Sequence, residues 1–327
     1  MKPEHEALLI LTQLQMPELA ELHLEIDPIV KGGSDRHFYR IKNAADGKPL
    51  MILMVYTLAR RDNPKFVPAT RRLATKGVHV PKILSFDEDK LCVWLEDLGS
   101  DDLHAHNGVT WELRRPLYEA TLREGAKIHN IEVARLTEAD LEELEPPFDE
   151  ALYEWEQDYF LGHFVRGHLG RDTTLPEFTE AHQALKKIRR QLAKEPRCLV
   201  HRDFQSQNVM LRDGSAWLVD YQGLRPGLAE YDLASLLYDP YVTLTETERD
   251  ELMAFYIKHR GLESGRCRER LKLCAAQRLM QALGAYANLS RNLGKPQFRQ
   301  HIPAAVANLT NICDSLPALL PLKPLFA

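Results

Sequence analysis

The feature that most restricts how this chain folds is a polar loop, HRDFQSQN at residues 201–208, set inside an apolar stretch. The residues CLV precede it, and VMLRDGSAWLVDY follows it. Short apolar runs of this kind are typical of buried strands. Asp and Asn are also common turn formers, so a plain turn is the alternative. A loop that gathers a histidine, an arginine, a carboxylate and an amide between two strands instead predicts a functional site.

Three oxygen-bearing side chains in and after this loop have a spacing that suits phosphoryl transfer. Asp203 and Asn208 are five residues apart, and Asp220 lies in the next apolar run. Hard cations such as Mg²⁺ take oxygen ligands, usually one or two protein carboxylates together with substrate phosphates and water. Asn208 and Asp220 can form that clamp, while Asp203 accepts the proton of an attacking hydroxyl. The loop therefore predicts one catalytic base and two metal ligands.

Composition argues against several other classes of function. The 327 residues carry a net charge of −5, which gives no basic footprint for nucleic acid. The early apolar run ALLILT is too short for a signal or membrane helix. Five cysteines, an odd number without a CxxC pair, are typical of free thiols in a reducing compartment. We expect a cytoplasmic protein with no nucleic-acid or membrane partner.

The chain divides into a part rich in strands and a part rich in helices. Residues 3–21 have the apolar spacing of a helix, and residues 27–57 predict three strands around a glycine pair. A further helix and two more strands complete the first part. From Thr110 onward helical periodicity dominates, apart from residues 198–221. We therefore expect a boundary near Gly99.

The polar loop carries a resemblance to a known family. His201, Asp203, Asn208 and Asp220 match the pattern HxDxxxxN followed by a strand and an Asp, and here the chain resembles the aminoglycoside-phosphotransferase-like kinases. The resemblance runs from about residue 31 to about residue 299. It implies an α+β, protein-kinase-like two-lobed fold, with ATP and Mg²⁺ as cofactors. The small antiparallel-sheet N-lobe would span residues 1–98, and the large helical C-lobe residues 99–327.

A narrower resemblance is to bacterial anomeric kinases of N-acetylmuramate and N-acetylglucosamine. Gln205 and the motifs GGSDRHFYRI, VWLEDLG, YDLASLLYDPYV and QRLMQALGAYANLSRNLGKP carry it, together with Tyr221-Gln222 after the metal-binding aspartate. It implies phosphorylation of the C1 hydroxyl of a small amino sugar during cell-wall recycling. Neither resemblance indicates an oligomeric state.

The resemblance also implies where the nucleotide binds. Gly33, Ser34 and Arg36 would lie over the ATP phosphates, because backbone N–H groups at glycines can approach phosphate closely. A glycine pair is equally ordinary in a hairpin. Glu96 and Leu98, in the link between the lobes, would present backbone groups to the adenine edge; the alternative is a strand that simply ends there.

One position departs from the usual kinase pattern. Kinases of this fold carry a lysine on the third strand that contacts the α- and β-phosphates, but the corresponding position falls near Met54. Arg36 or Arg40 can replace its charge. The departure fits the anomeric kinases, and it also fits a nucleotide-binding pseudokinase.

Further residues are expected around the loop. Gln205, Asp239 and Tyr159 are candidates for substrate contact together with Asp203 itself. By the resemblance, Asp232 would hold the loop through Arg202 or backbone amides, with His201 in a structural role; the alternative for Asp232 is an acidic residue at a helix N-terminus.

An acidic stretch favours a different acceptor. Residues 138–158, EADLEELEPPFDEALYEWEQD, contain no lysine or arginine. An acidic wall attracts cationic substrates such as aminoglycosides or choline, although a charge run is usually a solvated face. His104 and His106 lack further ligands at zinc-like spacing, so we expect them on the surface.

Overall fold

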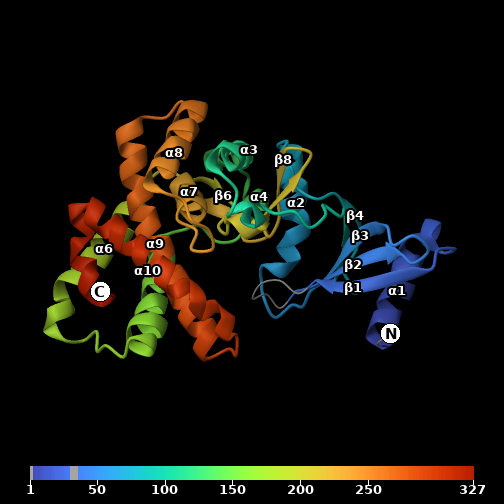
Figure 1. The fold of residues 1–327 in the computed structure, drawn as a ribbon, viewed down its shortest axis with the longest axis horizontal. Helices are drawn as coiled ribbons and strands as arrows, with labels where there is room; N and C mark the ends of the chain where they lie inside the picture. The colour runs from blue at the N-terminus through green and yellow to red at the C-terminus, as the bar shows by residue number, and fades with distance from the viewer. Residues whose placement is uncertain (1–2, 30–35) are drawn as a thin grey trace.

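The computed structural model describes residues 3–29 and 36–327 and has two lobes. Figure 1 shows the sheet lobe at one end of an elongated molecule and the helical lobe at the other, with helix α2 (Phe66–Thr75) between them. The predicted α+β, two-lobed architecture with a small antiparallel sheet and a large helical part is confirmed. No helix within these described ranges is long and apolar enough to cross a bilayer.

The N-lobe is a five-stranded antiparallel sheet with the strand order β1-β2-β3-β5-β4. Its strands are β1 (Leu24–Ile29), β2 (His37–Asn43), β3 (Pro49–Val55), β4 (Ile83–Asp87) and β5 (Cys92–Leu95). Helix α1 (Pro3–Gln15) packs on one face of the sheet. The predicted helix within residues 3–21 is thus present, and it ends earlier than the upper limit expected.

Successive side chains of β3 point to opposite faces of the sheet, and residues on both faces are buried. Met51 and Leu53 join a small core under α1 with Trp94. Met54 points the other way, into the large core that includes Phe66 and Leu73 of α2. Residues on both faces of β3 are therefore buried in a core, which explains why the strand is a continuous apolar run in the sequence.

The C-lobe is built around a long helix. Helix α9 (Ser264–Arg291) packs against several helices of this lobe, and a π-helix (Phe160–His168) continues α5 where α5 and α9 meet. The remaining helices are α3 (Trp111–His129), α4 (Glu138–Glu142), α5 (Glu150–Tyr159), α6 (Thr179–Ala193), α7 (Ala229–Leu237), α8 (Glu246–Arg260) and α10 (Ile302–Ser315).

Two small antiparallel sheets interrupt the helices where strands were expected. β6 (Cys198–Val200) pairs with β9 (Arg225–Gly227), and β7 (Val209–Arg212) pairs with β8 (Ser215–Leu218). The loop at residues 201–208 lies between β6 and β7, so both of its ends are anchored in strands. The lobe boundary at residues 98/99 falls after β5, in a link where Gly99 has φ +87°, and it stays a prediction.

Candidate active site

A buried carboxylate holds the backbone of the polar loop. Asp232 is fully buried in α7 and accepts hydrogen bonds from the backbone N–H groups of His201 at 2.7 Å and Arg202 at 2.8 Å. The His129 ring is also bonded to it. Arg202 has φ +80°, a left-handed conformation that costs a non-glycine residue energy and persists only where neighbours impose it. Two hydrogen bonds across this position provide that constraint.

Asp203 lies between two guanidinium groups. Arg202 Nη1 is 2.5 Å from its Oδ2, and Arg278 Nη2, from α9, is 3.4 Å from its Oδ1. Burial alone would raise the pKa of Asp203, but the charges of Arg202 and Arg278 outweigh it and hold that pKa well below its ordinary value. The side chain is 25% exposed. Asp203 is therefore an ionised carboxylate in a fixed orientation that a small molecule can reach.

Asn208 and Asp220 come together beside this carboxylate. Asn208 Nδ2 donates to the backbone carbonyl of Asp203 at 2.9 Å and lies 3.5 Å from Asp220 Oδ2. The backbone carbonyl of Asn208 accepts a hydrogen bond from Val219 N–H, which ties the end of the loop to the segment carrying Asp220. With its amide nitrogen used in this way, Asn208 has Oδ1 as the oxygen that the predicted metal role requires. Asp220 has φ +65°, a second left-handed residue in the site.

This oxygen pair fits a divalent cation that shares its ligands with a substrate. The residues described contain no group of three or more His, Cys, Asp or Glu side chains that would enclose a metal. Mg²⁺ commonly keeps several waters and takes only one or two protein carboxylates together with phosphate oxygens. Asn208 and Asp220 therefore fit the metal role predicted for them, which stays a prediction.

Arg36 and Arg40 of the N-lobe contact different carboxylates. Arg36 Nη2 is 2.5 Å from Asp220 Oδ1, so it lies at the edge of the oxygen pair. Arg40 forms a bidentate pair with Asp97 and donates to the carbonyl of Gly99, so its charge supports the link between the lobes.

Met54, at the position where related kinases carry a lysine, is fully buried. Of the two arginines expected to replace the strand lysine, Arg36 is the one near the metal-binding residues. The predicted phosphate contacts of Gly33 and Ser34 lie outside the described residues.

The link after β5 also joins the lobes. The Glu96 carboxylate accepts a hydrogen bond from Arg212 in β7 at 2.8 Å, and the Glu96 N–H donates to the carbonyl of Lys82. Burial raises the pKa of Glu96, but the hydrogen bond from Arg212 outweighs it and the net shift is downward. Leu98 is buried. The Glu96 side chain thus has a structural partner, and the adenine contact stays a prediction for the backbone of Glu96 and Leu98.

The three residues expected to contact the acceptor lie in different environments. Gln205 Oε1 is 3.5 Å from Arg278 Nη2, beside Asp203. The hydroxyl of Tyr159 accepts a hydrogen bond from Asn288 at 2.9 Å, and its ring stacks on the exposed Trp155.

Asp239 is 2% exposed and accepts hydrogen bonds from the backbone and hydroxyl of Ser206 and from Tyr241 N–H. These contacts favour a role for Asp239 in holding the loop, in place of the expected contact with a sugar hydroxyl. The sequence alone does not reveal this burial, because an acidic residue at the end of a helix also suits an open cleft.

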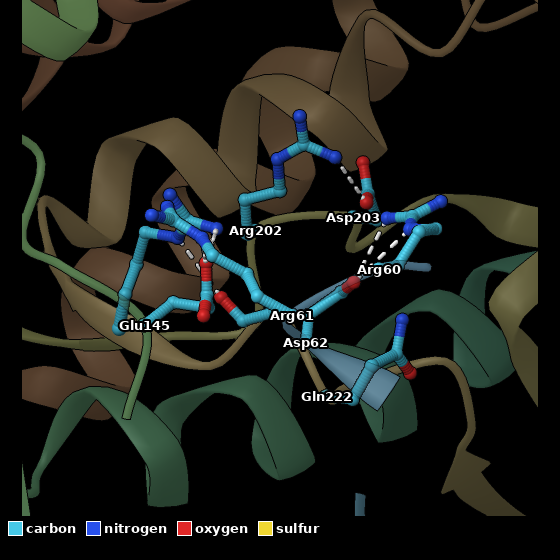
Figure 2. Close-up of a pocket in the computed structure, with 9 residues that line it drawn as sticks. Arg60, Arg61, Asp62, Glu145, Arg202, Asp203 and Gln222 are labelled. Atoms are coloured by element: carbon cyan, nitrogen blue, oxygen red, sulfur yellow. Dashed lines mark hydrogen bonds and ion pairs between the residues drawn. The ribbon is translucent and has the colours of Figure 1, made fainter. Parts of the chain in front are cut away.

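A pocket beside Asp203 includes N-lobe residues that the sequence analysis did not single out. Arg60, Arg61 and Asp62 of the N-lobe face Arg202 and Asp203 across it (Figure 2). The cavity has a volume of about 280 Å³, and its other lining residues are Glu145, Gln222, Gly223 and Arg225. The sequence signal that could have indicated these residues is RRD at residues 60–62, which begins five residues after the end of β3. Nothing in the sequence indicated that Glu145 and Arg225 lie at the same place.

The acidic stretch at residues 138–158 does not form an open acidic wall. Its carboxylates are paired with cations of neighbouring helices, as Arg72 contacts Asp140 and Glu143 and Arg189 contacts Glu154. Glu145, at 3% side-chain exposure, faces Arg61, Lys65 and Arg225, and Arg190 contacts Glu150. Five of the ten carboxylates in the stretch are thus paired with cations, which lowers the negative charge available to attract a cationic acceptor.

Curated relatives share most of the length of this chain. An N-acetylmuramate/N-acetylglucosamine kinase of Pseudomonas aeruginosa is 27% identical and covers 95% of this chain and 93% of its own length. A protein of the same name from Neisseria meningitidis is 28% identical over 76% of this chain and 75% of its own.

Solved structures with the same fold include kinases of other acceptors. A choline/ethanolamine kinase family protein from Mesorhizobium loti superposes with a TM-score of 0.65 at 16% identity and covers 98% of each chain. The ADP-bound aminoglycoside phosphotransferase APH(2'')-Ib gives a TM-score of 0.58 at 11% identity, covering 95% of this chain and 99% of its own. At these identities the likeness concerns the fold.

The model of the phosphotransferase enzyme family matches residues 25–273, about three quarters of the chain, and this range contains the polar loop, both oxygen ligands and the arginine pocket. The predicted membership of the aminoglycoside-phosphotransferase-like kinases is thereby confirmed, and the chain is a phosphotransferase that belongs to this family.

Proposed function

We propose that this protein is an ATP-dependent kinase that phosphorylates the C1 hydroxyl of N-acetylmuramate, N-acetylglucosamine or both, in the cytoplasm, as a step of cell-wall recycling. The observation that carries the proposal is the convergence of Asp203, Asn208 and Asp220 beside a pocket of sugar size. The names of two relatives that align with most of the chain support the acceptor.

The loop residues divide the work of phosphoryl transfer between them. Asp203 orients the acceptor hydroxyl and takes its proton as the bond to phosphorus forms. The transition state of such transfers is loose, so correct orientation contributes more than base strength. A carboxylate whose pKa is held low by Arg202 and Arg278 meets that need, because it stays ionised and fixed.

The nucleotide and the metal fit the other half of the site. When bound, Mg²⁺ neutralises charge on the β- and γ-phosphates. Asn208 and Asp220 would hold it, and Arg36, next to Asp220, would add positive charge near the phosphates in place of the strand lysine. Gly33 and Ser34, together with the backbone of Glu96 and Leu98, are the proposed contacts for the rest of ATP.

The charge around the site argues against the alternative with a cationic acceptor. Amine-bearing acceptors require carboxylates that are not already neutralised, whereas half of the carboxylates in the acidic stretch pair with cations of other elements and the pocket at Asp203 is rich in arginine. A pseudokinase is disfavoured because all three oxygen-bearing residues are present and meet.

The proposal is tested by measuring ADP release with amino sugars as acceptors. Asp203→Ala is expected to reduce kcat by about 100-fold or more while ATP still binds, because positioned acid–base groups contribute on the order of 10²–10⁴-fold. The product is expected to be acid-labile, as a C1 phosphate is and an ordinary alcohol phosphate is not.

A matched control is Asp213→Asn, since that side chain is 95% exposed in the β7–β8 turn. Turnover is expected to match the wild type. Equal turnover in Asp203→Ala would reject Asp203 as the base, and an acid-stable product would reject the C1 hydroxyl.

A further inference from the structure

The pocket beside Asp203 has more positive than negative charge. Four arginines line it against three carboxylates, and Lys65, which pairs with Glu145 at 3.1 Å, brings the cations to five. Five cations and three carboxylates leave a surplus of two positive charges. The side chains of Lys65, Arg202 and Arg225 are at most 24% exposed, so their charges are screened less than charges on an open surface.

Two of these arginines, Arg61 and Arg225, lie against the Glu145 carboxylate. Arg61 uses Nε toward Glu145 at 3.0 Å, and its side chain is 70% exposed. Because a guanidinium group has five N–H donors, this contact leaves the Nη groups of Arg61 able to bind an anion. Arg225 is buried, donates through Nε to the carbonyl of Gly223, and has Nη2 3.7 Å from the Glu145 carboxylate.

The position of the pocket connects this charge to the acceptor. Asp203 and Arg61 line one cavity of about 280 Å³, which is in the size range of ligand pockets for small molecules. The cavity therefore gives an acceptor whose hydroxyl lies at Asp203 room to extend toward the guanidinium groups. Arginine is well suited to such contacts because its planar fork matches a carboxylate in a bidentate arrangement.

The two candidate sugars differ in this respect. N-acetylmuramate is N-acetylglucosamine with a lactyl ether on C3, and the lactyl group ends in a carboxylate. We propose that Arg61, with Arg225 beside it, binds this carboxylate and makes the enzyme select acidic amino sugars over neutral ones. The inference rests on the proposed function and adds the residues that determine its specificity.

The decisive experiment compares both sugars in the same variant. Arg61→Met is expected to lower kcat/KM for N-acetylmuramate by about 10- to 100-fold, the range for losing a hydrogen bond between charged groups. For N-acetylglucosamine, kcat/KM is expected to stay within about two-fold, since that sugar has no carboxylate to lose. Turnover of the neutral sugar also shows that the variant is folded. Arg135→Met, at another exposed arginine with 79% side-chain exposure, is the matched control and leaves both values unchanged.

A change in the substrate provides an independent measurement. The methyl ester of N-acetylmuramate keeps the lactyl group and removes its charge, so the wild type is expected to treat it like the neutral sugar. The effect of Arg61→Met is expected to vanish with this ester, as a double-mutant cycle requires for two groups that interact directly.

Three results would overturn the inference. An unchanged kcat/KM for N-acetylmuramate would show that Arg61 does not contact it. An equal loss with both sugars, accompanied by a higher KM for ATP, would assign the pocket to the nucleotide. Wild-type protein that phosphorylates neither sugar would reject the proposed function itself, and only in that case do the two proposals fail together.

Discussion

At the scale of single residues, the site depends on charged side chains that fix one another. Asp203 has no freedom to turn, because Arg202 contacts one carboxylate oxygen and Arg278 the other. Arg278 also lies beside Gln205 and pairs with Gln281, so it is itself anchored on α9. The orientation of the proposed base is thus determined by a helix that begins about sixty residues later in the chain.

Arg278→Met tests this arrangement. We expect kcat to fall by about 10-fold or more, because a catalytic group displaced by about 1 Å can lose as much as 10²-fold. The pKa of Asp203 is held low partly by Arg278, so its removal raises that pKa and moves the acid limb of the kcat profile to higher pH. The measurement is kcat against pH for variant and wild type. A lower kcat with an unmoved acid limb would mean that Arg278 acts only on structure.

At the scale of helices and strands, the close approach of α9 to the end of α5 positions the helix that carries Arg278. Gly284 of α9 meets the end of α5, where an added Cβ would lie 2.8 Å from the Tyr159 ring and 3.1 Å from the backbone of Phe160. The backbone cannot move aside as the end of a flexible side chain can. The absence of a side chain at Gly284 therefore sets how closely α9 approaches α5.

Gly284→Ala is expected to destabilise the protein by about 1–3 kcal/mol, the usual effect of overpacking a tight contact. The gain in helix propensity, up to about 1 kcal/mol, offsets this only in part. The control is Gly108→Ala, where an added Cβ meets nothing within 4 Å. Urea unfolding of both variants checks the prediction, and equal midpoints for the two would contradict it.

At the scale of the whole molecule, the buried carboxylate of Glu145 contacts cations of both lobes. Glu145 precedes α5 in the C-lobe, and it faces Arg61 and Lys65, which come just before α2, as well as Arg225 of β9. Its side chain is 3% exposed. The same residue thus closes the arginine pocket and holds the start of α2 against the helical lobe.

Glu145→Gln is expected to lower the free energy of unfolding by about 3 kcal/mol. Removing one member of a buried charged cluster leaves its partners without compensation, which costs about 3–5 kcal/mol, and the exposure of Arg61 lowers this value. Glu142→Gln is the control, since Glu142 is exposed on α4. Chemical denaturation measures both, and a loss no larger than that of the control would show that Glu145 is not a structural charge.

Features that depend on residues close together in the sequence were predicted, and features that depend on contacts between distant residues were not. The strands around the polar loop and those within residues 27–57 depend on neighbours within a few residues, so periodicity and turn chemistry predicted them. The burial of Asp239 and the neutralised acidic stretch depend on what packs against them from elsewhere, and here the sequence left both interpretations open.

The sequence by itself determined that a carboxylate, an amide and a second carboxylate stand at the ends of short buried strands, because backbone geometry over a dozen or so residues dictates that spacing. Only the tertiary structure decided which charges surround them. Arg36 reaches Asp220 across 184 residues and Arg278 reaches Asp203 across 75. Such contacts arise when packed elements bring distant side chains into the same low-dielectric space, and this packing placed the arginine pocket beside the proposed base.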